Sequence, residues 1–101
     1  MNAIVQSDLE AILSERGKRY GTFKGHAAVA QHLKAVMCSH KPSDLSEPMW
    51  NCLAPDQREA LEMIQHKIAR ILNGDPDYAD SWDDIAGYAK LVSDRLKGVS
   101  R

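Results

Sequence analysis

Net charge of either sign is the first thing that this sequence lacks, because 13 Lys and Arg residues nearly balance 14 Asp and Glu residues and leave a formal net charge of -1. A nearly neutral chain offers no broad positive field for a nucleic-acid backbone, so binding to duplex nucleic acid is not expected. The only cysteines, Cys38 and Cys52, do not form a CxxC pair, and the N-terminal segment has neither a basic leader nor a long apolar stretch. No segment approaches the roughly 20 apolar residues that a membrane-spanning helix requires. These absences predict a cytoplasmic, disulfide-free protein with no membrane segment.

Strand-like alternation is also missing, and the apolar residues recur instead at helical spacing. The chain has 101 residues, which suits one compact domain with a single core, so residues 1–101 are expected to form a single all-α bundle. Ser7 followed by Glu10 matches a capping box at the start of the first helix, Gly17 or Gly21 could end that helix, and Gly98 could end the last one. The four expected helices run from about Asp8 to Arg19, His26 to Met37, Pro55 to Leu72 and Asp80 to Lys97.

A long proline-containing connection, residues 39–55, separates the second and third expected helices. Its prolines remove backbone donors, so the helical pattern fails there, with one helical turn expected near Trp50. A structureless loop of this length is uncommon in a compact domain, so four apolar residues are expected to hold it against the core or against another subunit: Leu45, Met49, Trp50 and Leu53.

The third expected helix has two distinct faces. At 100° per residue one face is apolar and carries Leu61, Ile64, Ile68, Ile71 and Leu72, while Glu59, Glu62, His66 and Arg70 lie opposite or beside it. Glu59, Glu62 and His66 follow one ridge and could offer ligands to a cation. Alternatively, these residues form a solvent-exposed face of the helix that is stabilised only by weak side-chain pairs within it.

Asp84 lies at the margin of the fourth expected helix, whose predicted core stripe contains Trp82, Ile85, Ala89, Val92 and Leu96. A carboxylate at such a margin loses hydration unless it meets a cation, and Lys67, Arg70 or a bound metal could each provide one. Asp80 and Asp83 have a simpler alternative, because an acidic residue or Ser81 at the start of a helix can serve as its cap.

A basic group, Arg16, Lys18, Arg19 and Lys24, lies next to Tyr20 and Phe23. Such a group is typical of a solvated face, and phosphate binding is the alternative. His26, His32 and His40 show no ligand-like spacing, so zinc is not expected, and no multi-glycine phosphate loop is present.

Three motifs carry a resemblance to known proteins: YGTF at Tyr20 to Phe23, KIARILNGDP at Lys67 to Pro76, and DSWDDIAGYA at Asp80 to Ala89. With them the chain resembles a family of small bacteriophage and prophage proteins of unknown function, over about four fifths of its length. The resemblance implies a phage or prophage protein that acts in the cytoplasm of a bacterial host cell.

The acidic helix, short break and second acidic helix are also similar to the all-α nucleotide pyrophosphatases of the MazG and dimeric dUTPase kind. In those enzymes carboxylates from two adjacent helices hold magnesium against the phosphates of a nucleotide. Glu59 and Glu62 match the latter part of their EExxE motif, but Arg58 stands where the first glutamate would be. The second motif, ExxD, is approximated by Asp80 with Asp83, or by Asp84 with Ser81 at the glutamate position.

The resemblance therefore implies a Mg²⁺-dependent nucleotide-phosphate binder or a nucleoside triphosphate pyrophosphohydrolase with an incomplete carboxylate motif. Glu59, Glu62, Asp80 and Asp84 would lie nearest the metal, Lys67 and Arg70 would bind phosphate, and Tyr20, Phe23 or Trp82 could stack on a base. No catalytic residue is assigned.

The alternative is a noncatalytic phage protein that binds and inhibits a host component, such as an anti-CRISPR or other anti-defence factor, including a nucleotide sponge. Its host protein partner would be held by Met49 and Trp50, because exposed aromatic and methionine side chains concentrate binding energy. Four short helices enclose little interior, so a homo-oligomer is expected in either case, with a dimer favoured.

Overall fold

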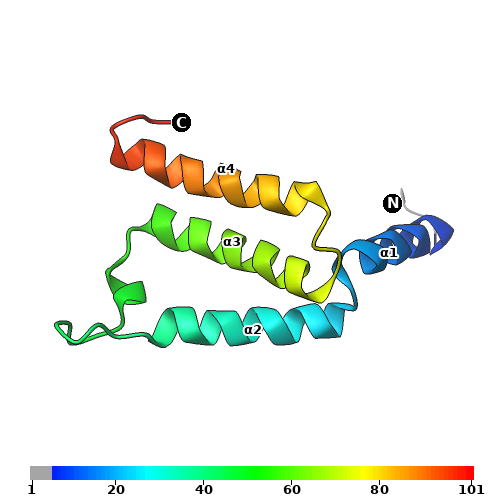
Figure 1. Ribbon diagram of the computed structural model, residues 1–101, viewed down its shortest axis with the longest axis horizontal. Helices are drawn as coiled ribbons and strands as arrows, with labels where there is room; N and C mark the ends of the chain where they lie inside the picture. The colour runs from blue at the N-terminus through cyan, green and yellow to red at the C-terminus, as the bar shows by residue number, and fades with distance from the viewer. Residues whose placement is uncertain (1–5) are drawn as a thin grey trace.

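The computed structural model describes residues 6–101, which form four α-helices and one short 3-10 helix and contain no strand in that range. The prediction of an all-α bundle is confirmed. The elements are α1 (Gln6–Tyr20), α2 (Phe23–Ser39), η1 (Met49–Cys52), α3 (Pro55–Asn73) and α4 (Ala79–Leu96), arranged as in Figure 1.

The first helix differs from its prediction at its start and on its apolar face. Ser7 lies inside α1 rather than at its cap, and the side-chain amide of Gln6 donates to Glu10 at 3.0 Å, so the predicted capping box is wrong. Of the two glycines, Gly21 ends the helix, because its φ of 74° lies in the left-handed region that glycine adopts without strain. The apolar side chains of α1, Leu9, Ile12 and Leu13, recur at helical spacing but are exposed, because α1 projects away from the other helices and meets them only near its end (Figure 1).

The second helix begins three residues before its predicted start at His26. Thr22 provides the cap, since its hydroxyl accepts a hydrogen bond from the backbone N–H of Gly25 at 3.1 Å. Only His26 and Ala30 of α2 are buried, so most of this helix is exposed or half-buried. The buried Gln65 of α3 fastens the two helices by donating its side-chain amide to the Ala30 carbonyl at 3.1 Å.

Pro55 and Gly98 have their predicted places, at the first position of α3 and just beyond the end of α4. The predicted helical turn near Trp50 is η1, which packs against α2. The predicted caps of the fourth helix are wrong, because α4 begins at Ala79 and both Asp80 and Ser81 lie within its first turn.

Within this bundle the three longer helices lie side by side in an open layer. The central helix, α3, packs against α2 on one side and α4 on the other, and these two outer helices do not pack against each other (Figure 1). Few apolar side chains are consequently enclosed: among the hydrophobic residues of the described range 6–101, only Ala30, Ala60 and Ala69 are buried, and no large side chain there is fully buried. Trp82, predicted on the core stripe, is 54% exposed, and its indole N–H donates to the Pro76 carbonyl at 2.8 Å.

Candidate functional site

Two turns that are far apart in the sequence lock together at one end of the layer. The side-chain amide of Asn73, at the end of α3, donates to the carbonyl oxygens of Tyr20 at 2.7 Å and Thr22 at 2.9 Å. In the reverse direction, the backbone N–H of Asp75 donates to the Arg19 carbonyl at 2.6 Å. The YGTF and NGDP motifs therefore fix the end of α1 against the rest of the protein.

Glycine is required where these turns touch. A Cβ at Gly21 would fall on the Asn73 carbonyl oxygen, and a Cβ at Gly74 would fall on the backbone of Arg19 and Tyr20. The missing side chains allow the two backbones to approach closely enough for the hydrogen bonds of Asn73.

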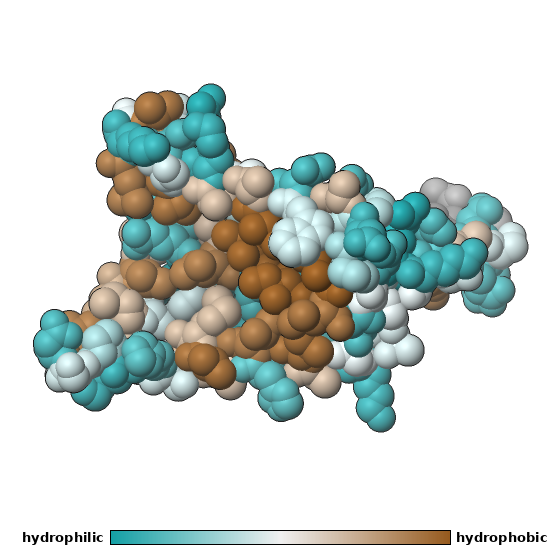
Figure 2. All heavy atoms as spheres, in the orientation of Figure 1, coloured by the Kyte–Doolittle hydropathy of each residue, from teal (hydrophilic) through white to brown (hydrophobic). Residues whose placement is uncertain are grey.

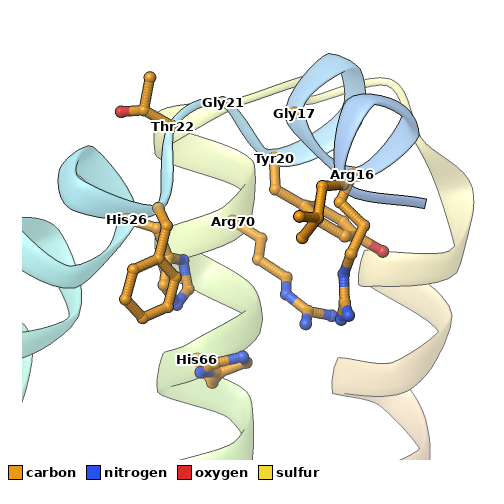
Figure 3. A pocket seen from close by; sticks show the side chains of 10 residues that line it. Arg16, Gly17, Tyr20, Gly21, Thr22, His26, His66 and Arg70 are labelled. Atoms are coloured by element: carbon orange, nitrogen blue, oxygen red, sulfur yellow. The ribbon is translucent and has the colours of Figure 1, made fainter. Parts of the chain in front are cut away.

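A pocket of about 560 Å³ opens beside this junction, between the end of α1, the start of α2 and the second half of α3 (Figure 3). We refer to it as the arginine pocket. None of its ten lining residues is acidic; they are Leu13, Arg16, Gly17, Tyr20, Gly21, Thr22, Phe23, His26, His66 and Arg70.

The two arginines give the pocket its charge. Neither Arg16 nor Arg70 forms an ion pair with a carboxylate of residues 6–101. The guanidinium carbon of Arg70 lies 4.2 Å from the ring centre of Tyr20, a cation–π contact that orients the side chain. The two side chains, one from α1 and one from α3, extend toward the same part of the pocket (Figure 3). Two cations without anionic partners in the described chain produce a positive field inside a concave surface.

Two histidines line the wall next to the arginines. His26 is only 7% exposed, and its ring centre lies 4.6 Å from that of His66 in an edge-to-face arrangement. Burial and then the charge of Arg70 lower the pKa of His66 from 6.5 to about 4, and the same two causes lower the pKa of His26. Both rings are therefore neutral at pH 7, and each has one N–H donor and one acceptor nitrogen. The buried Nδ1 of His26 has no hydrogen-bond partner within the described structure.

The predicted metal ligands are spread along the α3–α4 pair. These helices are antiparallel, with Asp56 bound to Arg95 at one end by hydrogen bonds of 2.6 and 2.7 Å and Asp84 paired with Lys67 further along at 3.1 Å. Asp80 is thus level with Ile71, and at 1.5 Å per residue Glu59 lies about 18 Å away along the helix axis.

The structure does not bring these carboxylates to one point. Glu59 lines a separate cavity near the end of α4, Glu62 is half-buried one turn further along α3, and Asp80 accepts a hydrogen bond from the Tyr78 hydroxyl at 2.8 Å. Asp84 has the basic neighbour that its position requires, Lys67. Within residues 6–101 no three His, Cys, Asp or Glu side chains gather as a metal-binding group.

The predicted phosphate ligands are divided in the same way. Arg70 lines the arginine pocket, whereas Lys67 faces α4 and is occupied by Asp84. Tyr20 and Phe23 also line the pocket, and Trp82 lies outside it.

Sequence reasoning grouped Arg16 with three other basic residues and missed His26 and Asn73. Arg19 has partners of its own, Glu15 at 3.0 Å and the ring of Tyr78 at 4.1 Å, so it does not line the pocket. The Thr-x-x-Gly spacing from Thr22 to Gly25 was a usable signal, because it marks a helix start that turns His26 inward. No local pattern marks Asn73 as the link to a turn 51 residues earlier.

Met49 and Trp50, the predicted partner-binding residues, lie on a different surface. They line an apolar groove between η1, α2 and α3 together with Met37, Leu53, Leu61, Ile64 and Ile68. The connection is thus packed against its own helices and still presents these two side chains at a groove.

The described helices include none that is long and apolar enough to cross a bilayer. Searches of curated proteins and of solved structures give no significant match to the chain. A family model does match, over residues 3–96, and this range includes both interlocking turns and the whole arginine pocket. The chain belongs to the family described as "Domain of unknown function (DUF6378)".

Proposed function

We propose that this protein binds a phosphate-bearing small molecule, a nucleotide, in the arginine pocket. The observation that carries the proposal is the presence of two guanidinium groups, Arg16 and Arg70, in a pocket that has no acidic lining residue. A guanidinium presents N–H donors in a planar fork that fits two oxygens of a phosphate or a carboxylate at once. A phosphate group has more oxygens and more negative charge than a carboxylate, so it can bind both arginines together.

The rest of the pocket suits the other parts of a nucleotide. Tyr20 and Phe23 offer ring faces, and stacking of a base on an aromatic side chain contributes about 1–3 kcal/mol. Phe23 is 81% exposed, so its ring face is accessible to a base. Neutral His26 and His66 can hydrogen-bond to a sugar or a base without repelling the arginines, and a volume of about 560 Å³ is in the usual range for small-molecule sites.

Binding without hydrolysis is the form of the proposal that the geometry supports best. Hydrolysis with Mg²⁺ would need hard oxygen ligands near the phosphates, and Glu59, Glu62, Asp80 and Asp84 lie outside the pocket. A metal ion would then enter with the nucleotide, held chiefly by its phosphates. This behaviour corresponds to the nucleotide sponge rather than to the pyrophosphohydrolase. A phage or prophage origin and action in the bacterial cytoplasm remain predictions that accompany it.

The test is isothermal titration calorimetry of the purified protein with nucleoside mono-, di- and triphosphates and cyclic dinucleotides, each with and without Mg²⁺. The reaction mixtures are also analysed for pyrophosphate and monophosphate. We expect binding of at least one nucleotide, no binding of the matching nucleoside, and no product. Absence of binding across the panel would refute the proposal, and release of pyrophosphate would restore the enzyme hypothesis.

The second hypothesis, binding to a host protein, places the binding site on a different surface of the molecule. It requires Met49 and Trp50 to contact another protein, and both line the apolar groove on α3. The homodimer expected from the sequence would use the same surface. These two occupants of the groove predict different masses for the purified protein, and the mass therefore decides between them.

A further inference from the structure

One face of the helix layer is apolar, uncharged and uncovered by any described element. Its centre is the ridge of α3 that carries Leu61, Ile64, Ile68 and Leu72, which 100° of rotation per residue places on one side of the helix. Two grooves adjoin on this ridge, and Leu53, Leu61 and Ile64 line both of them. We refer to this surface as the open face; Figure 2 shows its hydrophobic atoms gathered over the middle of the three-helix layer.

The arginine pocket lies on the opposite side of α3. His66 and Arg70 line the pocket, and on the helix they point roughly 180° away from Ile64, Ile68 and their neighbours. A ligand in the pocket and an occupant of the open face can therefore be present together.

The exposed area of the chain is larger than a single globular molecule of this mass should have. Monomeric proteins of 11.3 kDa expose about 5,700 Å² by the usual scaling with mass, whereas this chain exposes 7147 Å². Its radius of gyration, 16.9 Å, likewise exceeds the roughly 13 Å expected of a compact domain of this length. The projecting α1 accounts for part of the excess, and the missing second layer over α3 accounts for another part.

The total excess is on the order of 1,400 Å², and a specific interface typically covers about 800 Å² on each partner, so the part of the excess that lies over α3 is comparable in size to an interface. The residues that line the two grooves include no Asp, Glu, Lys or Arg. In a two-fold interface each surface meets its own copy, so any charge near the axis would oppose a like charge. An uncharged apolar face is therefore suited to a second copy of the same chain.

We infer that this protein forms a symmetric dimer in which the open face of one copy covers the open face of the other, with the two α3 helices facing each other. Two open layers then enclose a common core that neither has alone. Met49 and Trp50 lie at the edge of this interface and hold the proline-containing connection against it.

The test is sedimentation equilibrium of the full chain at micromolar concentration, without nucleotide. The wild-type protein is expected at twice the chain mass of 11.3 kDa. Leu61→Glu places a charge on the open face and should give the single chain mass. Leu9→Glu is the matched control, because Leu9 is 40% exposed and Leu61 is 41% exposed, but Leu9 lies on the projecting α1; this variant should remain a dimer.

Folding of each variant is checked by circular dichroism. If Leu61→Glu does not fold, Leu72→Glu replaces it, since Leu72 is 67% exposed on the same ridge and contributes little to the fold of one chain. A wild-type protein that sediments at the single chain mass would overturn the inference and leave the face for a host protein. A dimer that survives a folded Leu61→Glu or Leu72→Glu variant, or that is lost in Leu9→Glu, would overturn the assignment of the surface.

Discussion

Replacement of Asn73 by alanine tests the junction that fixes α1 and, with it, one side of the arginine pocket. The substitution removes two hydrogen bonds, to the carbonyls of Tyr20 and Thr22, from a partly buried side chain. At about 1 kcal/mol for each bond, the free energy of unfolding should fall by about 2 kcal/mol. For a domain of this length 1 kcal/mol shifts Tm by about 4–8 °C, so Tm should fall by about 8–16 °C.

Urea denaturation followed by circular dichroism measures this loss, at one protein concentration for all samples because a dimer makes stability depend on concentration. Asn51→Ala is the control, since Asn51 is exposed in η1 and its side chain makes no hydrogen bond within residues 6–101. Asn73→Asp should destabilise more than Asn73→Ala, because a carboxylate would face two carbonyl oxygens. A loss for Asn73→Ala no larger than that for Asn51→Ala would refute the account of the junction.

Three further substitutions and a pH series follow from the same contacts. Gly21→Ala should lower stability by more than Gly98→Ala in the same denaturation assay, because both glycines have positive φ but only at Gly21 would a Cβ meet another chain segment; equal losses would contradict the close approach. Asp84→Asn should cost about 1 kcal/mol, because the Asp84 side chain is 49% exposed and an asparagine oxygen there can still accept a hydrogen bond from Lys67, whose side chain is 12% exposed. The variant should leave nucleotide affinity unchanged; a large loss of Mg²⁺-dependent binding would instead support a metal ligand at Asp84. Since the folded state lowers the pKa of His66 from 6.5 to about 4, that group's stabilisation is complete above pH 6.5 and is lost as the pH falls through 4. The free energy of unfolding should therefore decrease as the pH falls from 6.5 to 4, and this decrease should be smaller in His66→Gln. Asp56 and Asp94 have pKa values below 3.8, so they affect stability only in more acidic solutions. If His66→Gln shows the same pH profile as the wild type, the ring of His66 is not a buried neutral group.

The helices were predictable from the sequence because local signals define them. Pro55 and Gly98 mark where the last two helices start and stop through the restricted or permissive backbone of a single residue. The predicted helix caps were wrong where several neighbouring residues could have capped the same helix. Ser7 has the chemistry of a helix cap but lies within α1, and Asp80 resembles a cap but accepts the Tyr78 hydroxyl instead.

The open layer was not predictable from periodicity, because an apolar stripe indicates which side of a helix avoids water and not which element covers it. Leu9 and Trp82 both lie on apolar stripes, yet one belongs to a projecting helix and the other is more than half exposed. The same limit applies to the carboxylates. Their spacing on α3 and α4 matched a metal motif, but the antiparallel register, fixed by the Lys67–Asp84 and Asp56–Arg95 pairs, separates Glu59 from Asp80.

The residues of the arginine pocket were partly predictable from the sequence. The sequence placed Arg16 beside Tyr20 and Phe23, and it placed His66 and Arg70 on one side of α3. That these two groups line one pocket depends on the contact of Asn73 with the α1–α2 turn, a tertiary contact between distant segments. The pocket could therefore be recognised only from the three-dimensional structure.

The most direct test of the central proposal is a comparison of nucleotide affinity among the wild-type protein, Arg70→Gln and Lys18→Gln. Each substitution removes one positive charge, but Lys18 is exposed on α1 and does not line the pocket. Loss of a charge-assisted hydrogen bond costs about 1.5–3 kcal/mol, which corresponds to roughly a 10- to 100-fold weaker affinity. We predict that loss for Arg70→Gln and an affinity close to wild type for Lys18→Gln. Equal affinities for Arg70→Gln and the wild type would show that the arginine pocket does not bind the phosphate.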